Sequence, residues 1–217
     1  GHTQHQIKSK VFHANYKKDD TFKPLLSGGD VKRFVVEWNK KQWLSYGPWL
    51  GAPREIRFFT KPRILVRQII SGNPLRIYAG YTDEELYNTQ TAFNILLKDR
   101  EFTLYQILAI LNSKLITFYH RYRFLDQSKK IFQKILIQDA KTFPIPKKDK
   151  NEIKYERIDV LVNHILKLHE QLALEQDTFT REQIQRQIAA TDRQIDQLVY
   201  QLYGLTEEEI KIVEEAV

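Results

Sequence analysis

The fold is decided by residues 103–146, which run TLYQILAILNSKLITFYHRYRF (103–124) and, after three further residues, SKKIFQKILIQDAKTFPIP (128–146). Thr103 is a suitable N-cap residue and apolar side chains follow it at helical spacing, so we predict one helix to about Arg121. Arginines, lysines and aromatic rings gather where that helix ends, before Pro144 and Pro146 close the unit. This order predicts an apolar scaffold that presents one basic edge to a polyanion.

The composition is typical of a soluble globular protein, with 42% hydrophobic and 28% charged residues in a chain of 217. The sequence has no run of 18 apolar residues and opens on no secretion signal, so we expect no membrane partner and a cytoplasmic location. The absence of cysteine excludes disulfides and zinc–thiolate sites. Gly1-His2 is typical of an expression-tag remnant, which predicts a piece of a longer protein.

The net charge of +7 hides a division of the chain into two parts. Residues 1–150 hold 27 Lys and Arg against 13 Asp and Glu, whereas residues 151–217 hold 7 against 14. A basic excess of this size is usually met by nucleic acid. The alternatives are lysines kept for solubility and an anionic membrane surface, and the basic part has no amphipathic helix with a clean apolar face for the latter.

The period of the apolar residues predicts an α+β fold: a mixed sheet-and-helix domain, then a long antiparallel helical hairpin. Strands are expected at 34–38 and 63–70, with weaker candidates at 75–81 and 91–97, separated by glycine and proline turns. We divide the chain into a tag remnant and leading segment (1–19), the α+β domain (20–150), and the hairpin arm with a short terminal helix (151–217).

Two apolar stripes near a heptad repeat predict the hairpin, with its turn at residues 175–180. Gly204 is expected to end the second helix, and Thr206 with Glu209 to form a capping box that opens the last helix. The stripes consist of Ile158, Leu161, Ile165, Leu168 and Leu172, and of Ile184, Ile188, Thr191, Ile195, Leu198 and Leu202.

No motif for catalysis or metal binding stands out. The histidines are scattered, no nucleophile motif occurs, and Asp139-Ala140-Lys141 has no acidic partner at a nuclease-like spacing. Cations interleaved with aromatic residues remain, and arginine can bind guanine edges while both cation types neutralise phosphates. The predicted DNA-binding residues are Lys32, Arg33, Arg63, Arg67, Arg121, Arg123, Lys129, Lys130 and Lys134.

Five segments in this order carry a family resemblance. They are 24–33 (PLLSGGDVKR), 62–69 (PRILVRQI), 108–116 (LAILNSKLI), 143–146 (FPIP) and 195–206 (IDQLVYQLYGLT). Over about residues 20–217 the chain resembles the C-terminal target-recognition domain, the TaqI-like specificity domain, of Type IIG restriction–modification enzymes and adenine-N6 DNA methyltransferases.

The resemblance implies sequence-specific binding of double-stranded DNA through the major groove, without catalysis by this fragment. Such enzymes hold S-adenosylmethionine and an Asn-Pro-Pro-Tyr motif in a preceding domain, whereas this chain has only Asn73-Pro74-Leu75-Arg76. It therefore implies no cofactor here, S-adenosylmethionine and Mg²⁺ in the parent, and the parent's methyltransferase domain as a partner.

Two functions remain open for the acidic hairpin. Its charge of −7 favours a spacer or docking arm over direct phosphate contact. The alternative is a helical protein-interaction module with non-specific nucleic-acid affinity, in which the hairpin is the working surface. An enzyme complete in itself is disfavoured by the missing motifs.

Overall fold

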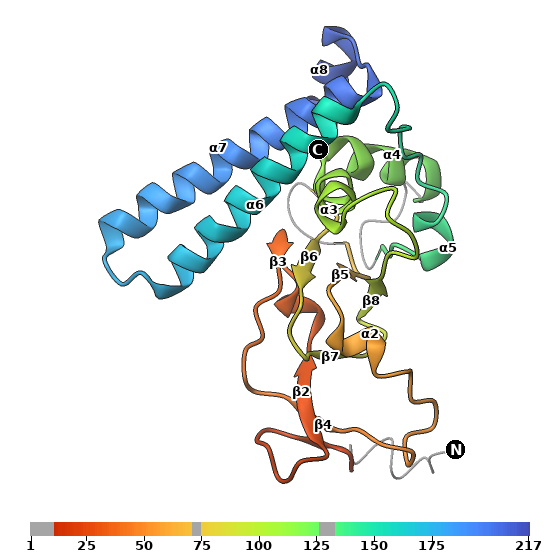
Figure 1. Cartoon of the computed structure of the whole chain (residues 1–217), viewed down its shortest axis with the longest axis vertical. Helices are drawn as coiled ribbons and strands as arrows, with labels where there is room; N and C mark the ends of the chain where they lie inside the picture. The colour runs from red at the N-terminus through yellow and green to blue at the C-terminus, as the bar shows by residue number, and fades with distance from the viewer. Residues whose placement is uncertain (1–10, 71–74, 126–132) are drawn as a thin grey trace.

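The computed structural model describes residues 11–70, 75–125 and 133–217, and it has the predicted α+β fold. Two mixed four-stranded sheets lie one below the other in Figure 1, helices cover the upper sheet, and a long helical hairpin projects from the upper half. The hairpin packs on the body of the protein near residues 155–166 and 195–202, and its turn lies away from the sheets.

The lower sheet has the strand order β1–β4–β2–β7, in which only β2 and β7 run parallel. A 3₁₀ turn, η1 (Gly28–Asp30), follows β2, and a short helix, α2 (Arg57–Thr60), follows β4. Asp30 closes η1 by accepting hydrogen bonds from the Ser27 backbone N–H and hydroxyl. The strands are β1 (His13–Ala14), β2 (Phe22–Leu26), β4 (Trp43–Ser45) and β7 (Tyr87–Asn88).

The upper sheet has the order β3–β6–β5–β8, with β3 and β6 parallel. Its strands are β3 (Phe34–Val35), β5 (Arg63–Arg67), β6 (Ala79–Thr82) and β8 (Ala92–Ile95). Beyond Arg67 the chain continues to pair, because Ile70 N–H donates to the Gln133 carbonyl at 3.0 Å and Ile135 N–H to the Gln68 carbonyl at 2.9 Å. Residues 133–135 thus extend the sheet beside the end of β5.

The strand expected at 34–38 is shorter than predicted. It begins at the buried Phe34, whose φ is 69°, and beyond Val35 the chain turns to pair with the end of η1, since Val36 bridges Val31 and the Glu37 N–H donates to the Asp30 carbonyl at 2.8 Å. Gly80 of β6 is required beside this strand. A Cβ at Gly80 would lie 2.3 Å from the Val35 carbonyl oxygen, so only glycine lets β3 approach this closely.

The helix predicted from Thr103 to about Arg121 is two helices, α3 (Leu104–Asn112) and α4 (Lys114–Phe124). Thr103 is the N-cap as predicted and forms a capping box with Gln106. Ser113 breaks the run with a ψ of 150°, and its hydroxyl accepts the Ile116 N–H while donating to the Ile110 carbonyl. A serine can bond to both helix ends in this way, so its hydroxyl supplies one partner at the end of α3 and one at the start of α4.

The hairpin prediction is confirmed by α6 (Glu152–Leu174) and α7 (Thr178–Tyr203), which pack against each other along their length. Gly204 ends α7 at a φ of 69°, and Thr206 and Glu209 form the predicted capping box of α8 (Glu207–Ala216). One apolar core runs from the upper sheet through α3 into the base of the hairpin. It includes Ile64, Val66, Leu108, Leu111, Ile158, Val162, Ile195 and Leu198.

Polar contacts lock this junction. The Asn112 amide, fully buried, donates to the Ala79 carbonyl at 2.8 Å and accepts the Ala79 N–H at 3.1 Å, as a paired strand would. The Arg33 guanidinium donates to the Asn112 carbonyl at 2.6 Å and to both carboxylate oxygens of Asp192 in α7 at 2.6 and 2.8 Å. Arg33 therefore joins the sheet, α3 and the hairpin.

We predict that Arg33→Ala and Asp192→Asn each lower the free energy of unfolding by about 1–3 kcal/mol, because each leaves a largely buried charge or carbonyl without its partner. Urea unfolding followed by tryptophan fluorescence measures this. The exposed neighbour Lys32→Ala is the matched control and should change stability by less than about 0.5 kcal/mol. Strictly additive costs in the double variant would contradict a direct Arg33–Asp192 interaction.

Candidate nucleic-acid interface

The end of β5 brings together a cation, an aromatic ring and a second cation. The Arg67 guanidinium carbon lies 5.6 Å from the centre of the Tyr78 ring, and the Arg67 N–H donates to the Tyr78 carbonyl at 2.9 Å. Lys134 is exposed and lies opposite Ile69 in an antiparallel bridge. Because alternate strand residues share a face, Arg67, Ile69 and Lys134 point to the same side of the sheet.

We call Arg67, Tyr78 and Lys134 the β5 end cluster. The η1 turn borders it, since a Cβ at Gly28 would lie 3.9 Å from Arg67 Cγ and 3.5 Å from the Thr91 carbonyl oxygen. A cation held over an aromatic ring beside a second, exposed cation suits contact with phosphates and with base faces or edges. Gly28, which has no side chain, thus leaves open the space beside Arg67.

A second basic group lies at the end of α4. Arg123 is exposed, with its guanidinium carbon 5.9 Å from the Phe124 ring centre. Arg121 is partly buried and donates to the Ala216 carbonyl at 2.7 Å, which binds α4 to the end of α8. Of the two predicted arginines here, Arg123 has the exposure that a ligand contact needs.

Two predicted DNA-binding arginines instead hold the fold together. Arg63 is fully buried and donates to the carbonyls of Lys61, Glu84 and Leu86 at 2.7–3.0 Å. Burial lowers the pKa of Arg63 to about 10, so its charge persists at neutral pH. Arg33 is engaged by Asp192 and Asn112. Both guanidinium groups are thus bound within the protein rather than free at its surface.

The remaining predicted cations are Lys32, which is exposed just after η1, and Lys129 and Lys130, which lie outside the described residues. The sequence reasoning missed Tyr78, although residues 75–81 were expected to form a strand and its alternation with the buried Ile77 and Ala79 could have placed it on the side of Arg67.

The described residues contain no group of three or more His, Cys, Asp or Glu side chains that could hold a metal ion. Nor is any helix in the described ranges long and apolar enough to cross a membrane.

Comparison with known proteins places the chain in a family. The model of the TaqI-like C-terminal specificity domain matches residues 23–145, more than half of the chain. The chain therefore belongs to the TaqI-like C-terminal specificity domain family.

The solved structure of the Type IIL restriction-modification enzyme MmeI in complex with DNA has a similar fold, with a TM-score of 0.59 and 13% sequence identity. The match covers 99% of this chain and 32% of the MmeI chain, so this chain spans about a third of that protein's length. A comparison with curated proteins gives no match.

Beside the basic end of α4, His120 anchors the helix in the core. It is buried among aromatic rings, 5.7 Å from the Phe124 ring centre and 5.9 Å from that of Phe143, and among the described residues neither ring nitrogen has a hydrogen-bond partner. Burial lowers the pKa of His120 to about 4, against a weaker opposing effect of the Asp139 carboxylate. His120 is therefore neutral in the folded protein at neutral pH.

The lowered pKa of His120 predicts that the free energy of unfolding depends on pH. Between pH 6.5 and about 4 the unfolded chain binds a proton at His120 that the folded protein does not, so stability falls as the pH falls through this window. Relative to His120→Leu, the wild type should lose about 3 kcal/mol of unfolding free energy from pH 7 to pH 4. Urea titrations across this range measure the difference, and parallel pH curves for the two proteins would contradict the prediction.

Proposed function

We propose that this chain is the DNA-recognition domain of a restriction–modification enzyme and binds a double-stranded site sequence-specifically. The observation that carries the proposal is the family match to a specificity domain over residues 23–145, the part of the chain with the basic excess. The likeness of fold to an enzyme solved in complex with DNA supports it.

In the proposed complex the β5 end cluster faces the duplex. Arg67, oriented by Tyr78, reads a base edge, because a planar guanidinium can donate two parallel hydrogen bonds to guanine. Lys134, Lys32 and Arg123 are exposed and neutralise phosphates, which positions the domain without selecting a sequence. Arg33 and Arg63 support this surface from within.

The parent is proposed to be a Type IIG restriction–modification enzyme or a related adenine-N6 DNA methyltransferase, with its methyltransferase domain before this chain. It either cleaves and methylates DNA or only methylates it. S-adenosylmethionine and Mg²⁺ would then be bound by the parent's other domains, and this domain would supply the site but no catalysis. A cytoplasmic location follows from the proposal that the enzyme acts on cellular DNA.

The hairpin is proposed to dock the methyltransferase domain. Three residues of α6 at spacings of seven and fourteen are highly exposed: Ile153 (73%), Val160 (67%) and Leu174 (82%). Such a stripe on one helix face favours contact with another protein surface. The same stripe favours the second candidate function, a protein-interaction module with non-specific nucleic-acid affinity.

Selection of bound duplexes from a random pool tests the main proposal. We expect one short sequence to be enriched, because a specificity domain binds its own site more tightly than other sites. A pool that binds without enrichment would favour the interaction module. Sedimentation with and without duplex separates the two further, since self-association without a DNA-dependent shift supports only the module.

We predict that Arg67→Ala weakens binding to the selected site by about 1–3 kcal/mol and relaxes its sequence preference, because it removes a base contact. Lys134→Ala, Lys32→Ala and Arg123→Ala should weaken binding to all sequences alike, each reducing the slope of log affinity against log salt by about 1. Titration of labelled duplexes across salt concentrations measures both effects.

Lys211→Ala is the matched control, since Lys211 is an exposed cation of α8. Its Nζ lies 3.9 Å from Oε1 of Glu215. Affinity and salt slope should stay at wild-type values. If Arg67→Ala and Lys134→Ala behave like this control, the assignment of the β5 end cluster is wrong.

A further inference from the structure

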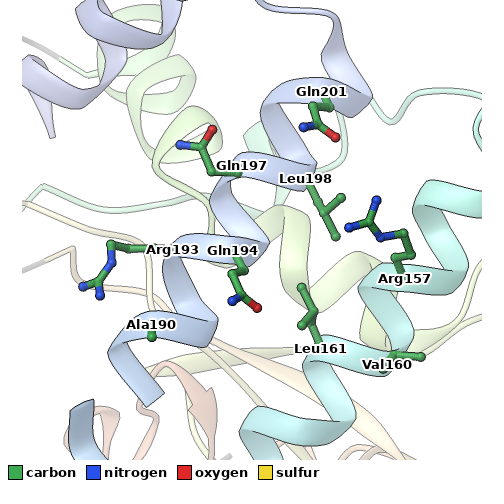
Figure 2. Close-up of a pocket in the computed structure, with 9 residues that line it drawn as sticks. All are labelled: Arg157, Val160, Leu161, Ala190, Arg193, Gln194, Gln197, Leu198 and Gln201. Atoms are coloured by element: carbon green, nitrogen blue, oxygen red, sulfur yellow. The ribbon is translucent and has the colours of Figure 1, made fainter. Parts of the chain in front are cut away.

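A groove of about 560 Å³ runs along the outer side of the hairpin, between α6 and α7. In Figure 2 Leu198 of α7 and Leu161 of α6 face each other at its floor. Arg157 of α6 and Gln194 of α7 point into the space between the helices, while Arg193 and Gln197 point to the other side of α7. The groove is open to solvent, which suits an extended ligand lying across it. Because the floor is apolar, a charged ligand that loses water there must receive its hydrogen bonds from the walls.

The walls supply donors and no negative charge. Arg157 of α6 extends over the groove toward α7, Gln194 faces α6, and Arg193 stands on the outer flank of α7 (Figure 2). Gln197 and Gln201 continue the α7 wall. In the described ranges no hydrogen bond or ion pair engages the guanidinium of Arg157 or Arg193, so both remain available to a ligand.

A third cation, Lys154, lies beside Gln201 of the groove lining. Lys154 donates through Nζ to the Gln201 carbonyl at 3.0 Å and to the Asn151 side-chain oxygen at 3.0 Å. These contacts with neutral groups leave its positive charge uncompensated. Arginine, lysine and glutamine donors without an acidic neighbour in the lining make a surface that favours phosphate.

The net charge of −7 does not describe this face, because many acidic side chains of residues 151–217 are engaged elsewhere. Asp192 is bound by Arg33, and Asp196 accepts the Lys114 N–H at 2.9 Å. Asp159 accepts hydrogen bonds from the α3 capping residues Thr103 and Gln106. Glu182 pairs with Arg186 within α7, and Glu214 pairs with Lys114. The segment is acidic as a whole and basic at the groove.

We propose that the α6–α7 groove holds the phosphate backbone of the same duplex that the β5 end cluster binds, as a second, sequence-independent contact. This rests on the proposed function. The hairpin is then a backbone clamp along this groove. Because Val160 of the exposed α6 stripe also lines the groove, docking is left to the stripe residues outside it, Ile153 and Leu174. The sequence predicted that the hairpin avoids phosphate because residues 151–217 have a net charge of −7. In the structure, however, the groove is lined by cations and neutral residues, and the acidic residues lie elsewhere.

The first test is a salt titration of the full 217-residue chain on the selected duplex and on an unrelated duplex. The double variant Arg157→Gln, Arg193→Gln should flatten the slope of log affinity against log salt by about 2, since each phosphate contact contributes about 0.9. It should weaken both duplexes by the same factor, because phosphate contacts carry no sequence information. The matched control is Lys167→Gln, Lys211→Gln, which removes the same charge from exposed positions outside the groove.

If the groove variant has the same slope of log affinity against log salt as the wild type, the proposal that the groove binds phosphates is wrong, and the proposed function is unaffected. Equal flattening by the groove and control variants also overturns the groove proposal, because the effect is then one of net charge. Failure of the wild-type chain to bind any duplex overturns both proposals. All four substituted residues are exposed, and thermal melting of each variant establishes that it is folded.

The second test uses the absence of cysteine from the chain, which allows a single site to be labelled. An iron chelate attached to Gln194→Cys should cleave the bound duplex near the groove, and one on Lys134→Cys should cleave it at the β5 end cluster. The same label on Lys211→Cys should give no cleavage. Cleavage from position 134 without cleavage from position 194, or equal cleavage from 211, overturns the groove contact.

Discussion

The arrangement of this protein depends on the buried amide of Asn112. With no exposed surface, the side-chain amide binds both backbone groups of Ala79. The backbone carbonyl of Asn112 accepts a hydrogen bond from the Arg33 guanidinium, which also pairs with Asp192. A buried polar group is costly unless it is satisfied, so these contacts fix one relative position of sheet, helix and hairpin. This junction therefore fixes the position of the β5 end cluster relative to the α6–α7 groove.

The requirement that buried polar groups have hydrogen-bond partners also distinguishes the structural cations from the exposed ones. Arg63 and Arg33 have short side-chain contacts to carbonyls or a carboxylate, and their positions are internal. Arg67 and Lys134 keep their charges at the surface, beside the η1 turn. A basic excess in a sequence therefore overstates the charge that a ligand meets, and an acidic excess can hide a basic face for the same reason.

Much of the fold could be predicted from the sequence where short-range chemistry decides it. The capping boxes at Thr103 and Thr206, the glycine end of α7 and the two apolar stripes involve residues within one or two turns of each other. Prediction failed where a distant partner decided the outcome. Ser113 looks like an ordinary helical position, yet its backbone is extended, and the carboxylate of Asp196 in α7 accepts the N–H of the next residue, Lys114, where α4 begins. Phe34 likewise takes a left-handed conformation that its own strand-like sequence opposes.

The sequence by itself determined the α+β class, the hairpin, the basic and acidic halves and the family resemblance, because periodicity, caps and motif order are local properties of the chain. Only the tertiary structure decided which cations are exposed. Arg63 and Arg67 stand four residues apart in one strand and point to the same side, but one end of that side is covered by the lower sheet and the other borders the surface. Burial is set by what packs against a residue, and that packing is contributed by parts of the chain far away in sequence.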